Sequence, residues 1–442
     1  MAGTILIAIL WLLPVVWAQD GPQLFDTGDE TAPPAGEDLI DRDYAAFGQQ
    51  VLLEGLRGQL PVVPTDPRKI QGKAKQVMPK NGYDYITGAA GEEATKEANR
   101  LAFRQWRIVP RVLTPTTPRN LSVTLFGHRY GAPAIMAPIG DQSLYHPDKE
   151  VGTAIACANL SVPFTLSTAA STGIEELVAK APRGPKWFQL YWPFNEELLA
   201  SILNRAHASG YQVLVVTLDG WAGGWRPSDL DTANAPNFLG QGNEVGFQDP
   251  VFRKMFAEES EGGTPENDTI AASVSWITKV ISGTSQDWSH LRILRKHWKG
   301  PIVLKGILSV QDARMAVRYG MDGIVVSNHG GRQMDGGVAT LDVLPEIVDA
   351  VGKRTTVLFD SGLRTGADVF KALALGAKAV LVGRPVVYGL GINGTAGALA
   401  AFAGILADLD ITMGFAGAKR VSDLTRDRLR RIPYSVPPGY IR

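Results

Sequence analysis

The sequence predicts a (β/α)8 barrel with an N-terminal extension and a long loop after the fourth strand. Eight short apolar runs recur from residue 133 onward, and each has the length and composition of a buried strand. Amphipathic, helix-like segments separate most of these runs, as is typical of parallel strands joined by helices. Polar residues follow nearly every run at its carboxyl end, where the active sites of barrels form.

The expected strands are Pro133–Ala137, Pro163–Ser167, Lys186–Tyr191, Gln212–Asp219, Pro301–Gly306, Gly323–Ser327, Thr356–Ser361 and Ala379–Gly383. The clearest expected helices between them are Gly173–Ala181, Glu196–Ser209, Ser309–Tyr319 and Gly366–Leu375. A doubly wound open sheet is the alternative architecture. Because no Gly-x-Gly-x-x-Gly motif follows an early strand, a Rossmann-type nucleotide site lacks its usual support.

Three parts are expected along the chain: a signal peptide over residues 1–18, an N-terminal extension over 19–80, and the barrel domain over 81–430. The apolar run from Thr4 to Trp17 is followed by a site that a signal peptidase reads, which predicts cleavage after Ala18 and secretion. An N-terminal membrane anchor is the alternative, but the run is too short to span a bilayer comfortably. No other apolar stretch is expected to be long enough, so stable membrane insertion is not expected.

The composition favours a globular protein that acts on small molecules. Its 44 basic and 44 acidic side chains balance, which argues against nucleic acid or an anionic membrane as the main partner. The single cysteine, Cys157, excludes an internal disulfide and is expected to pack in the core. A homo-oligomer is expected, and no metal ligands are assigned. Glycosylation sequons start at Asn120, Asn159, Asn267 and Asn393, and Asn267 is the best placed of them to carry a sugar.

Two further segments do not follow the alternation of strands and helices. Residues from Asp20 to Asp43 are expected to be loose, and a helix is expected over Asp43–Leu56. The long irregular piece between Trp225 and Ser285 follows the fourth strand, with helical patches near Pro250–Glu259 and Ala271–Ile281. Loops of this length are usually lids or linkers, so it is expected to cover the rim of the barrel, to form an oligomer contact, or both.

The segment from Ser327 to Gln333 carries the first candidate chemistry. His329 and Arg332 stand three residues apart on a loop that two glycines make pliable, directly after an apolar strand. An arginine offers a fixed fork of donors to a carboxylate, and a histidine exchanges a proton near neutral pH. The pair alone is more typical of a solvated surface turn. The other polar residues at the same rim favour a functional site.

The last two strand ends predict an anion site. Asp360, Gly362 and Arg364 follow the seventh strand, and Gly383 and Arg384 follow the eighth. Barrels often bind a phosphate at this place, where glycines expose backbone N–H groups and arginines add charge. Asp360 suits a chain of hydroxyl groups, so the combination indicates a nucleotide-like cofactor.

These motifs resemble the FMN-dependent 2-hydroxy acid oxidases and dehydrogenases. The resemblance rests on Ser-Asn-His-Gly-Gly-Arg-Gln at 327–333, Asp-Ser-Gly-Leu-Arg at 360–364, Lys-Ala-Leu-Ala-Leu-Gly-Ala at 371–377 and Gly-Arg-Pro at 383–385. It extends to Tyr-Asp-Tyr at 83–85, Trp-Phe-Gln-Leu-Tyr at 187–191 and Val-Thr-Leu-Asp at 216–219. The segment Gly-Trp-Arg-Pro-Ser-Asp-Leu at 224–230, with the long loop after it, resembles the lactate 2-monooxygenase branch.

The resemblance implies a role for each residue. The flavin ring would be held by Ala137, Pro138, Ile139, Gly140, Ser167, Gln189 and Thr217, with Ser327 among the cofactor residues. Lys305 would stabilise the reduced flavin, and Asp360, Gly362, Arg364, Gly383 and Arg384 would hold the ribityl phosphate. Tyr85, Arg226 and Arg332 would bind the substrate carboxylate. Tyr191 would hydrogen-bond the substrate hydroxyl, and His329 would be the base, oriented by Asp219.

Departures from the family pattern lie in the pocket. Gly220 stands where relatives commonly have Thr, Gly223-Gly224 loosens the same loop, and Asp141 places an acid beside Gly140. The expected reaction is the oxidation of an L-2-hydroxy acid to the 2-oxo acid with oxygen as acceptor. Oxidative decarboxylation and a dehydrogenase with another acceptor are the alternatives. An FMN-dependent isopentenyl diphosphate isomerase or a non-catalytic flavin binder would not need the His329–Arg332 pair.

Overall fold

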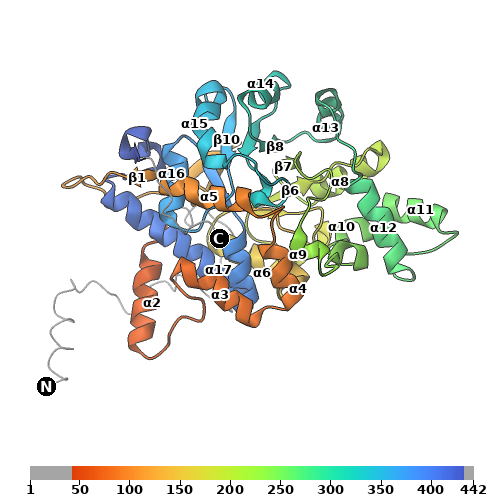
Figure 1. Ribbon diagram of the computed structural model, residues 1–442, viewed down its shortest axis with the longest axis horizontal. Coiled ribbons are helices and arrows are strands. Elements are labelled where there is room, and N and C mark those ends of the chain that lie inside the picture. The colour runs from red at the N-terminus through yellow and green to blue at the C-terminus, as the bar shows by residue number, and fades with distance from the viewer. Residues whose placement is uncertain (1–41, 433–442) are drawn as a thin grey trace. The chain divides into compact units, whose positions relative to one another are not determined.

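The computed structural model describes residues 42–432. The expected signal peptide lies outside this range, and so does nearly all of the acidic stretch that follows it. The described residues form one compact unit. Figure 1 shows this unit with its helices arranged around a central barrel.

In the described part of the chain, residues 42–432, eight parallel strands close into a barrel. Their order around the barrel is β10-β11-β4-β5-β6-β7-β8-β9. Their bounds are β4 (Ala134–Met136), β5 (Phe164–Leu166), β6 (Lys186–Leu190), β7 (Leu214–Thr217), β8 (Ile302–Ile307), β9 (Gly323–Val326), β10 (Thr356–Phe359) and β11 (Ala379–Val382). Each strand lies within one of the expected ranges or extends past it by one residue. The prediction of a (β/α)8 barrel is confirmed.

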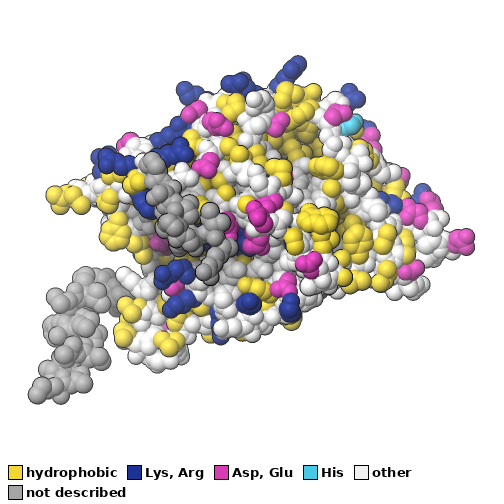
Figure 2. Space-filling view, in the orientation of Figure 1, with side chains coloured by type: hydrophobic (Ala, Val, Ile, Leu, Met, Phe, Trp, Pro, Cys, Tyr) yellow, Lys and Arg dark blue, Asp and Glu magenta, His cyan; other side chains and the backbone are white. Residues whose placement is uncertain are grey.

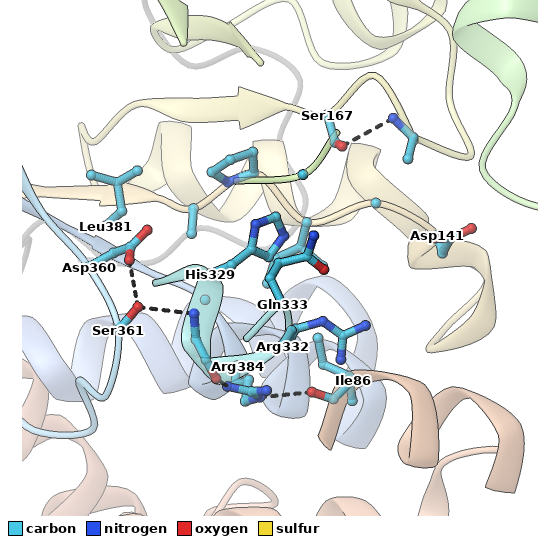
Figure 3. A pocket seen from close by; sticks show the side chains of 18 of the residues that line it. Ile86, Asp141, Ser167, His329, Arg332, Gln333, Asp360, Ser361, Leu381 and Arg384 are labelled. Carbon is cyan, nitrogen blue, oxygen red and sulfur yellow. Dashed lines mark hydrogen bonds between the residues drawn. The ribbon is translucent and has the colours of Figure 1, made fainter. Parts of the chain in front are cut away.

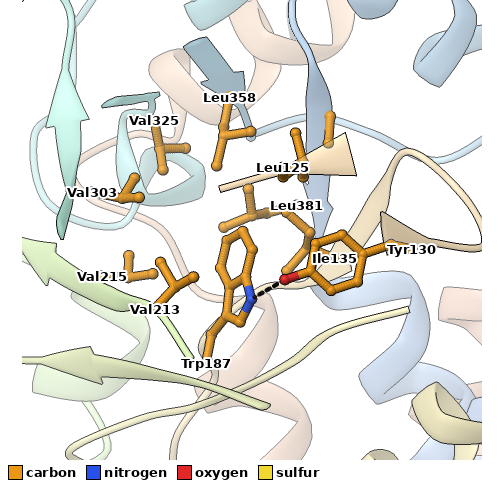
Figure 4. Packing of buried hydrophobic residues seen from close by; sticks show 11 residues of the cluster. Leu125, Tyr130, Ile135, Trp187, Val213, Val215, Val303, Val325, Leu358 and Leu381 are labelled. Carbon is orange, nitrogen blue, oxygen red and sulfur yellow. Dashed lines mark hydrogen bonds between the residues drawn. The ribbon is translucent and has the colours of Figure 1, made fainter. Parts of the chain in front are cut away.

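The interior of the barrel is layered, because side chains alternate along a strand and residues two apart point the same way. Trp187, Val215, Val303, Val325 and Leu358 belong to one buried apolar cluster (Figure 4). Two residues further along the same five strands stand Gln189, Thr217, Lys305, Ser327 and Asp360. We call this second set the polar layer. The barrel therefore changes from apolar to polar toward the carboxyl ends of its strands.

A hairpin closes the opposite end of the barrel. Strands β2 (Val123–Leu125) and β3 (His128–Tyr130) pair in antiparallel register. Tyr130 packs in the apolar cluster and its hydroxyl accepts a hydrogen bond of 3.1 Å from Nε1 of Trp187 (Figure 4). This bond satisfies the indole N–H deep in the core, where an unpaired donor would be costly. Access to the interior is thus left to the carboxyl end.

The barrel helices are α6 (Lys149–Asn159), α7 (Ile174–Lys180), α8 (Glu196–Ala208), α13 (Leu291–His297), α14 (Val310–Arg318), α15 (Thr340–Val351), α16 (Gly366–Ala374) and α17 (Arg384–Phe415). The four helices expected from the sequence are confirmed to within a residue at either end. Side chains cap three of them: Asn195 accepts from the backbone N–H of Leu198, Ser309 from that of Asp312, and Thr365 from that of Asp368.

Helix α17 corrects one expectation. No second apolar stretch was expected to reach the length of a membrane span, yet α17 has 32 residues and is apolar enough by composition. Most of its apolar window, 61%, is buried inside the protein. The helix is kinked at Asn393 and Gly394 and packs against α3 (Pro67–Val77), α6 and α16 (Figure 1). These contacts make α17 a core helix.

Helices before the barrel form its N-terminal cover: α2 (Ala46–Leu56), α3, α4 (Lys80–Thr87) and α5 (Ala94–Arg104). The helix expected over Asp43–Leu56 corresponds to α2. Strand β1 (Trp106–Ile108) pairs with β12 (Leu429–Arg431) and ties this part to the end of the described chain. Figure 2 shows basic and acidic side chains interspersed on one face, as the balanced composition suggests.

The long segment after β7 is folded into short helices: α9 (Pro227–Leu230), η3 (Pro236–Leu239), α10 (Glu244–Phe247), α11 (Pro250–Glu259) and α12 (Thr269–Val280). The two helical patches expected there are confirmed as α11 and α12. Helices α10 to α12 group together beside α8 (Figure 1). Asn237 on η3 and Ile281 after α12 reach the cavity at the barrel rim. The segment therefore covers part of that rim.

Candidate active site

One cavity at the carboxyl ends of the strands gathers most of the predicted site residues (Figure 3). Its empty space of about 1190 Å³, part of which is open to solvent, is ample for a mononucleotide with a small acid. The predicted residues that line it are Tyr85, Ala137, Pro138, Ile139, Gly140, Ser167, Tyr191, Arg226, Lys305, His329, Arg332, Asp360, Gly362, Arg364, Gly383 and Arg384. Four predicted residues lie behind the cavity wall: Gln189, Thr217, Ser327 and Asp219. Gln189 hydrogen-bonds Ser167 at the wall, and Thr217 in turn hydrogen-bonds Gln189. Ser327 and Asp219 both hydrogen-bond His329.

The polar layer is held by Gln189. Its Oε1 accepts from the Ser167 hydroxyl at 3.0 Å and from the Thr168 backbone N–H at 3.1 Å. Its Nε2 donates to Oγ1 of Thr217 at 2.9 Å. Since these buried groups satisfy one another, the side of the cavity formed by β5, β6 and β7 is rigid. Ser167 is the member of the network that faces the cavity.

A histidine–carboxylate pair stands at the cavity, where His329 lines the wall and Asp219 supports it from behind. Nδ1 of His329 lies 2.9 Å from Oδ1 of Asp219, which follows β7. His329 has a left-handed backbone with φ of 58°, and the Ser327 hydroxyl accepts its backbone N–H at 3.1 Å. Ser327 thus holds the loop of the histidine and lies outside the cavity lining. The pair joins two strand ends that are 110 residues apart.

The buried charge of Lys305 shifts the pKa values of both members of this pair. Lys305 is buried, and its Nζ lies 3.6 Å from Oδ2 of Asp360. Burial opposes the charge of Lys305, but Asp219 and Asp360 outweigh burial and raise its pKa. Burial also raises the pKa of Asp219, while Lys305 and His329 lower it by more. Burial and Lys305 lower the pKa of His329. The site therefore contains a charged lysine, an ionised aspartate and a neutral histidine.

Two arginines flank the ring of Tyr85. Cζ of Arg332 lies 4.9 Å and Cζ of Arg226 lies 5.8 Å from the centre of the ring. Arg332 donates to the backbone carbonyls of Tyr85 and Gly88, and Nε of Arg226 donates to Oδ2 of Asp229 at 2.6 Å. These contacts fix both guanidinium groups at the cavity wall. Their remaining N–H donors suit a carboxylate, which accepts strong hydrogen bonds from a guanidinium group.

The opposite end of the cavity is built for an anion. Nη1 of Arg364 donates to the Leu363 carbonyl at 2.8 Å, and Arg384 donates to the carbonyls of Ile86, Gly88 and Gly330 at 2.8 to 3.0 Å. No carboxylate in residues 42–432 pairs with either guanidinium. Burial, with Arg332 and Arg364 nearby, lowers the pKa of Arg384 to about 10. An anion bound between the two arginines would compensate this charge.

The backbone at this end also fits a phosphate. Gly362 has a φ of 86°, and a Cβ there would lie 2.7 Å from the carbonyl oxygen of Asn99. Only glycine lets the chain take this turn, which brings the backbone close to the cavity. Ser361 accepts the Gly330 N–H at 3.0 Å and donates to Oδ1 of Asp360 at 2.7 Å (Figure 3). The residues present therefore fit the phosphate and the polyol chain of FMN.

Several residues of the cavity were not predicted. Asp141 was noticed as an acid but given no role, while Tyr145 and Asn237 were missed. Gln333 was also missed as a contact: its Nε2 donates to the carbonyls of Asp219 and Ala222 at 2.7 Å and so fixes the loop after β7. Gln333 stands in the quoted motif and could have been found there. Asn237 offered no signal, because the path of the long segment cannot be derived from composition.

A cavity with two arginines suited to an anion at one end and a histidine–carboxylate pair on a barrel is typical of FMN-dependent oxidoreductases. The comparisons with known proteins agree. Residues 74–431 match the family described as FMN-dependent dehydrogenase, and the chain belongs to this family. The protein is thus an enzyme of the FMN-dependent 2-hydroxy acid oxidoreductase family, and FMN is its cofactor.

Relatives support the assignment over nearly the whole chain. An FMN-dependent alpha-hydroxy acid dehydrogenase of Penicillium citrinum is 53% identical over 401 residues, which is 90% of this chain and 98% of that protein. Human 2-hydroxyacid oxidase 1 is 36% identical over 82% of this chain and 95% of its own length. A crystal structure of mandelate oxidase superposes with a TM-score of 0.72 at 34% identity, covering 84% of this chain and all of the other.

Proposed function

We propose that the protein oxidises an L-2-hydroxy acid to the 2-oxo acid and passes the two electrons to oxygen. The overall reaction converts the hydroxy acid and oxygen into the oxo acid and hydrogen peroxide. The observation that carries this proposal is the 2.9 Å pair of His329 and Asp219 beside the two arginines that flank Tyr85. A base next to a carboxylate clamp is what proton removal from a 2-hydroxy acid requires.

Each residue of the site has a task in this reaction. Arg226 and Arg332 bind the substrate carboxylate, and Tyr191 at the cavity wall hydrogen-bonds the substrate hydroxyl. His329 removes a proton from the substrate, and Asp219 stabilises the imidazolium that results. Bound FMN supplies the two-electron acceptor. Ala137 to Gly140 and Ser167 line the wall for its ring, while Arg364 and Arg384 hold its phosphate.

The test is a substrate screen with the purified holoprotein. L-lactate, glycolate, L-mandelate and longer 2-hydroxy acids are mixed with it without oxygen, and bleaching of the flavin absorbance is followed. Air is then admitted, and peroxide and 2-oxo acid are measured. We expect bleaching by at least one acid and about one peroxide per oxo acid. A flavin that no 2-hydroxy acid bleaches would refute the proposal.

A second outcome, oxidative decarboxylation, has its own support. Asn237 and Ile281 of the long segment reach the cavity and cover part of its opening, which favours retention of the products. A 2-oxo acid that stays in the cavity with hydrogen peroxide reacts with it, and the products are the shorter carboxylic acid, carbon dioxide and water. Carbon dioxide in place of peroxide in the same screen would identify this course, which is that of a lactate 2-monooxygenase. Bleaching without reoxidation by air would indicate a dehydrogenase with another acceptor.

We further propose that the protein enters the secretory pathway, that Asn267 carries a sugar and that the chain forms a homo-oligomer. The support for secretion is the apolar run that ends before Ala18. Asn267 lies exposed in the loop before α12. N-terminal sequencing of the mature protein should begin at Gln19, and enzymatic deglycosylation should lower its mass. A mature protein that retains Met1 would contradict cleavage. Sedimentation of the purified protein, which measures its mass in solution, tests whether it is a homo-oligomer.

A further inference from the structure

Resting on the proposed function, we infer that Asp141 and Tyr145 form a specificity subsite for a 2-hydroxy acid whose side chain ends in a hydroxyl or carboxamide. Both side chains line the cavity that holds the histidine base. Asp141 follows the loop after β4, and Tyr145 follows the short 3-10 helix η2 (Gln142–Leu144). Both are buried, with 1% and 2% of their surface exposed. Neither has a task in proton transfer, in the carboxylate clamp or in the phosphate site.

Asp141 accepts a hydrogen bond at the cavity but is not saturated by it. Nδ2 of Asn237 donates to its Oδ1 at 2.9 Å, and the Tyr85 hydroxyl donates to Oδ1 of Asn237 at 3.3 Å. An ionised carboxylate has about four acceptor positions. Asp141 therefore retains capacity for a donor that enters the cavity. Burial raises the pKa of Asp141 to about 7, so the ionised carboxylate that accepts such a donor predominates above pH 7.

Tyr145 supplies an independent observation. Its hydroxyl is buried and has no hydrogen-bond partner among residues 42–432. A buried hydroxyl without a partner is destabilising, and buried polar groups are otherwise almost always paired. Because Tyr145 lines the cavity beside Asp141, a ligand group can supply the missing partner. The two side chains together offer an acceptor and a free hydroxyl to one small polar group.

The charges nearby decide which polar group fits. Above pH 7 a negative group would be repelled by the ionised Asp141, and a positive group would meet Arg332, which interacts electrostatically with both Asp141 and Tyr145. A neutral hydroxyl or carboxamide can donate to the Asp141 carboxylate and accept from the Tyr145 hydroxyl. An apolar side chain would leave both buried groups unsatisfied, and sites of this kind reject such ligands strongly.

The position of Asp141 beside the carboxylate clamp agrees with a short side chain. The Tyr85 ring is flanked by the carboxylate clamp, and its hydroxyl reaches Asn237, the neighbour of Asp141. The subsite therefore lies next to the clamp, on the hydroxyl side of Tyr85, and Arg332 itself interacts with Asp141. This proximity suits a 2-hydroxy acid with a side chain of a few atoms.

The experiment compares two isosteric substrates on the holoenzyme. L-2-hydroxysuccinamate ends in a carboxamide, and L-2-hydroxy-4-methylpentanoate has methyl groups in its place. We expect kcat/KM for the amide to exceed that for the branched acid by on the order of a hundredfold. Asp141→Leu should reverse the preference, Tyr145→Phe should reduce it, and Asp141→Asn should retain part of it. Equal kcat/KM values in the wild type, or an unchanged ratio in Asp141→Leu, would overturn the inference.

A matched control separates the subsite from general effects of a buried acid. Asp249 is also fully buried, where it accepts from the backbone N–H groups of Val251 and Phe252 at the start of α11, but it does not line the cavity. Asp249→Asn should leave the substrate ratio unchanged, and a shift as large as that of Asp141→Leu would contradict the subsite.

A binding measurement keeps the inference testable without turnover. The non-oxidisable acids succinamate and 4-methylpentanoate lack the 2-hydroxyl, and their binding is followed by the change in flavin absorbance. Succinamate should bind more tightly to the wild type, and Asp141→Leu should abolish this difference. If no 2-hydroxy acid bleaches the flavin but succinamate is still preferred, the proposed reaction fails and the subsite stands. Equal binding of the two acids would refute the subsite alone.

Discussion

Oδ1 of Asp219 accepts a hydrogen bond from Nδ1 of His329 over 2.9 Å. The direction of this bond follows from the charges, because Lys305 and His329 keep the pKa of Asp219 low and an ionised carboxylate only accepts. Nδ1 therefore carries the proton of the neutral ring, and Nε2 is the basic nitrogen. This tautomer gives His329 a free base for the substrate and gives the imidazolium a partner.

Replacement of the base tests this assignment directly. His329→Gln should keep FMN bound and should slow bleaching of the flavin by substrate by on the order of a hundredfold or more. The measurements are the flavin content of the purified variant and the anaerobic rate of bleaching. His297→Gln on α13, where the histidine lies near Glu196 and far from the cavity, is the matched control. A wild-type bleaching rate in His329→Gln would show that another group is the base.

The pH dependence follows from the lowered pKa of His329. Burial and Lys305 favour the neutral ring, so His329 stays a base at pH values below the ordinary histidine pKa of about 6.5. The acid limb of kcat/KM, which reports the free enzyme, should therefore lie below pH 6.5. Asp219 raises the pKa of His329, so Asp219→Asn should move the limb to still lower pH while the maximal rate falls. A limb above pH 7 in the wild type would contradict this account.

The barrel could be predicted because its signal is local and repeated. Each strand carries its own apolar run, and the polar layer appears in sequence as one polar residue two positions after a core residue, as in Trp187 and Gln189. The site residues on strand ends could therefore be placed with the fold. Whether Gln189 faces the cavity or supports Ser167 from behind depends on side-chain hydrogen bonds, which no spacing encodes.

The remaining site residues depend on long-range packing. Asn237 reaches Asp141 only because the segment after β7 folds over the rim, and the two residues are 96 positions apart. The apolar stretch of α17 was not recognised for a related reason. Its small and apolar residues form a single kinked helix that packs against α3, α6 and α16.

The carboxylate clamp predicts a loss that depends on substrate charge. Arg332→Lys keeps the charge but loses the planar fork, and Arg226→Met loses both, so each should weaken binding by roughly 1.5 to 3 kcal/mol. The discriminating measurement compares a 2-hydroxy acid with its methyl ester. The variants should lose most of the preference for the acid. If Arg226→Met weakens both compounds equally, Arg226 only braces α9 through Asp229 and leaves the clamp.

Gly220 predicts a steric effect on Tyr191. A Cβ at Gly220 would lie 2.5 Å from Cε1 of Tyr191 and 3.2 Å from Cγ2 of Thr217, so any side chain must push the Tyr191 ring, which lines the cavity and which we propose bonds the substrate hydroxyl. Gly220→Ala should lower kcat by about tenfold or more, since small displacements of catalytic groups are costly. Gly223→Ala, on the same loop but with nothing within 4 Å of the added atom, is the control. Because Tyr191→Ala removes the clashing ring, Gly220→Ala should add little to it, and fully additive losses would show that Gly220 acts elsewhere.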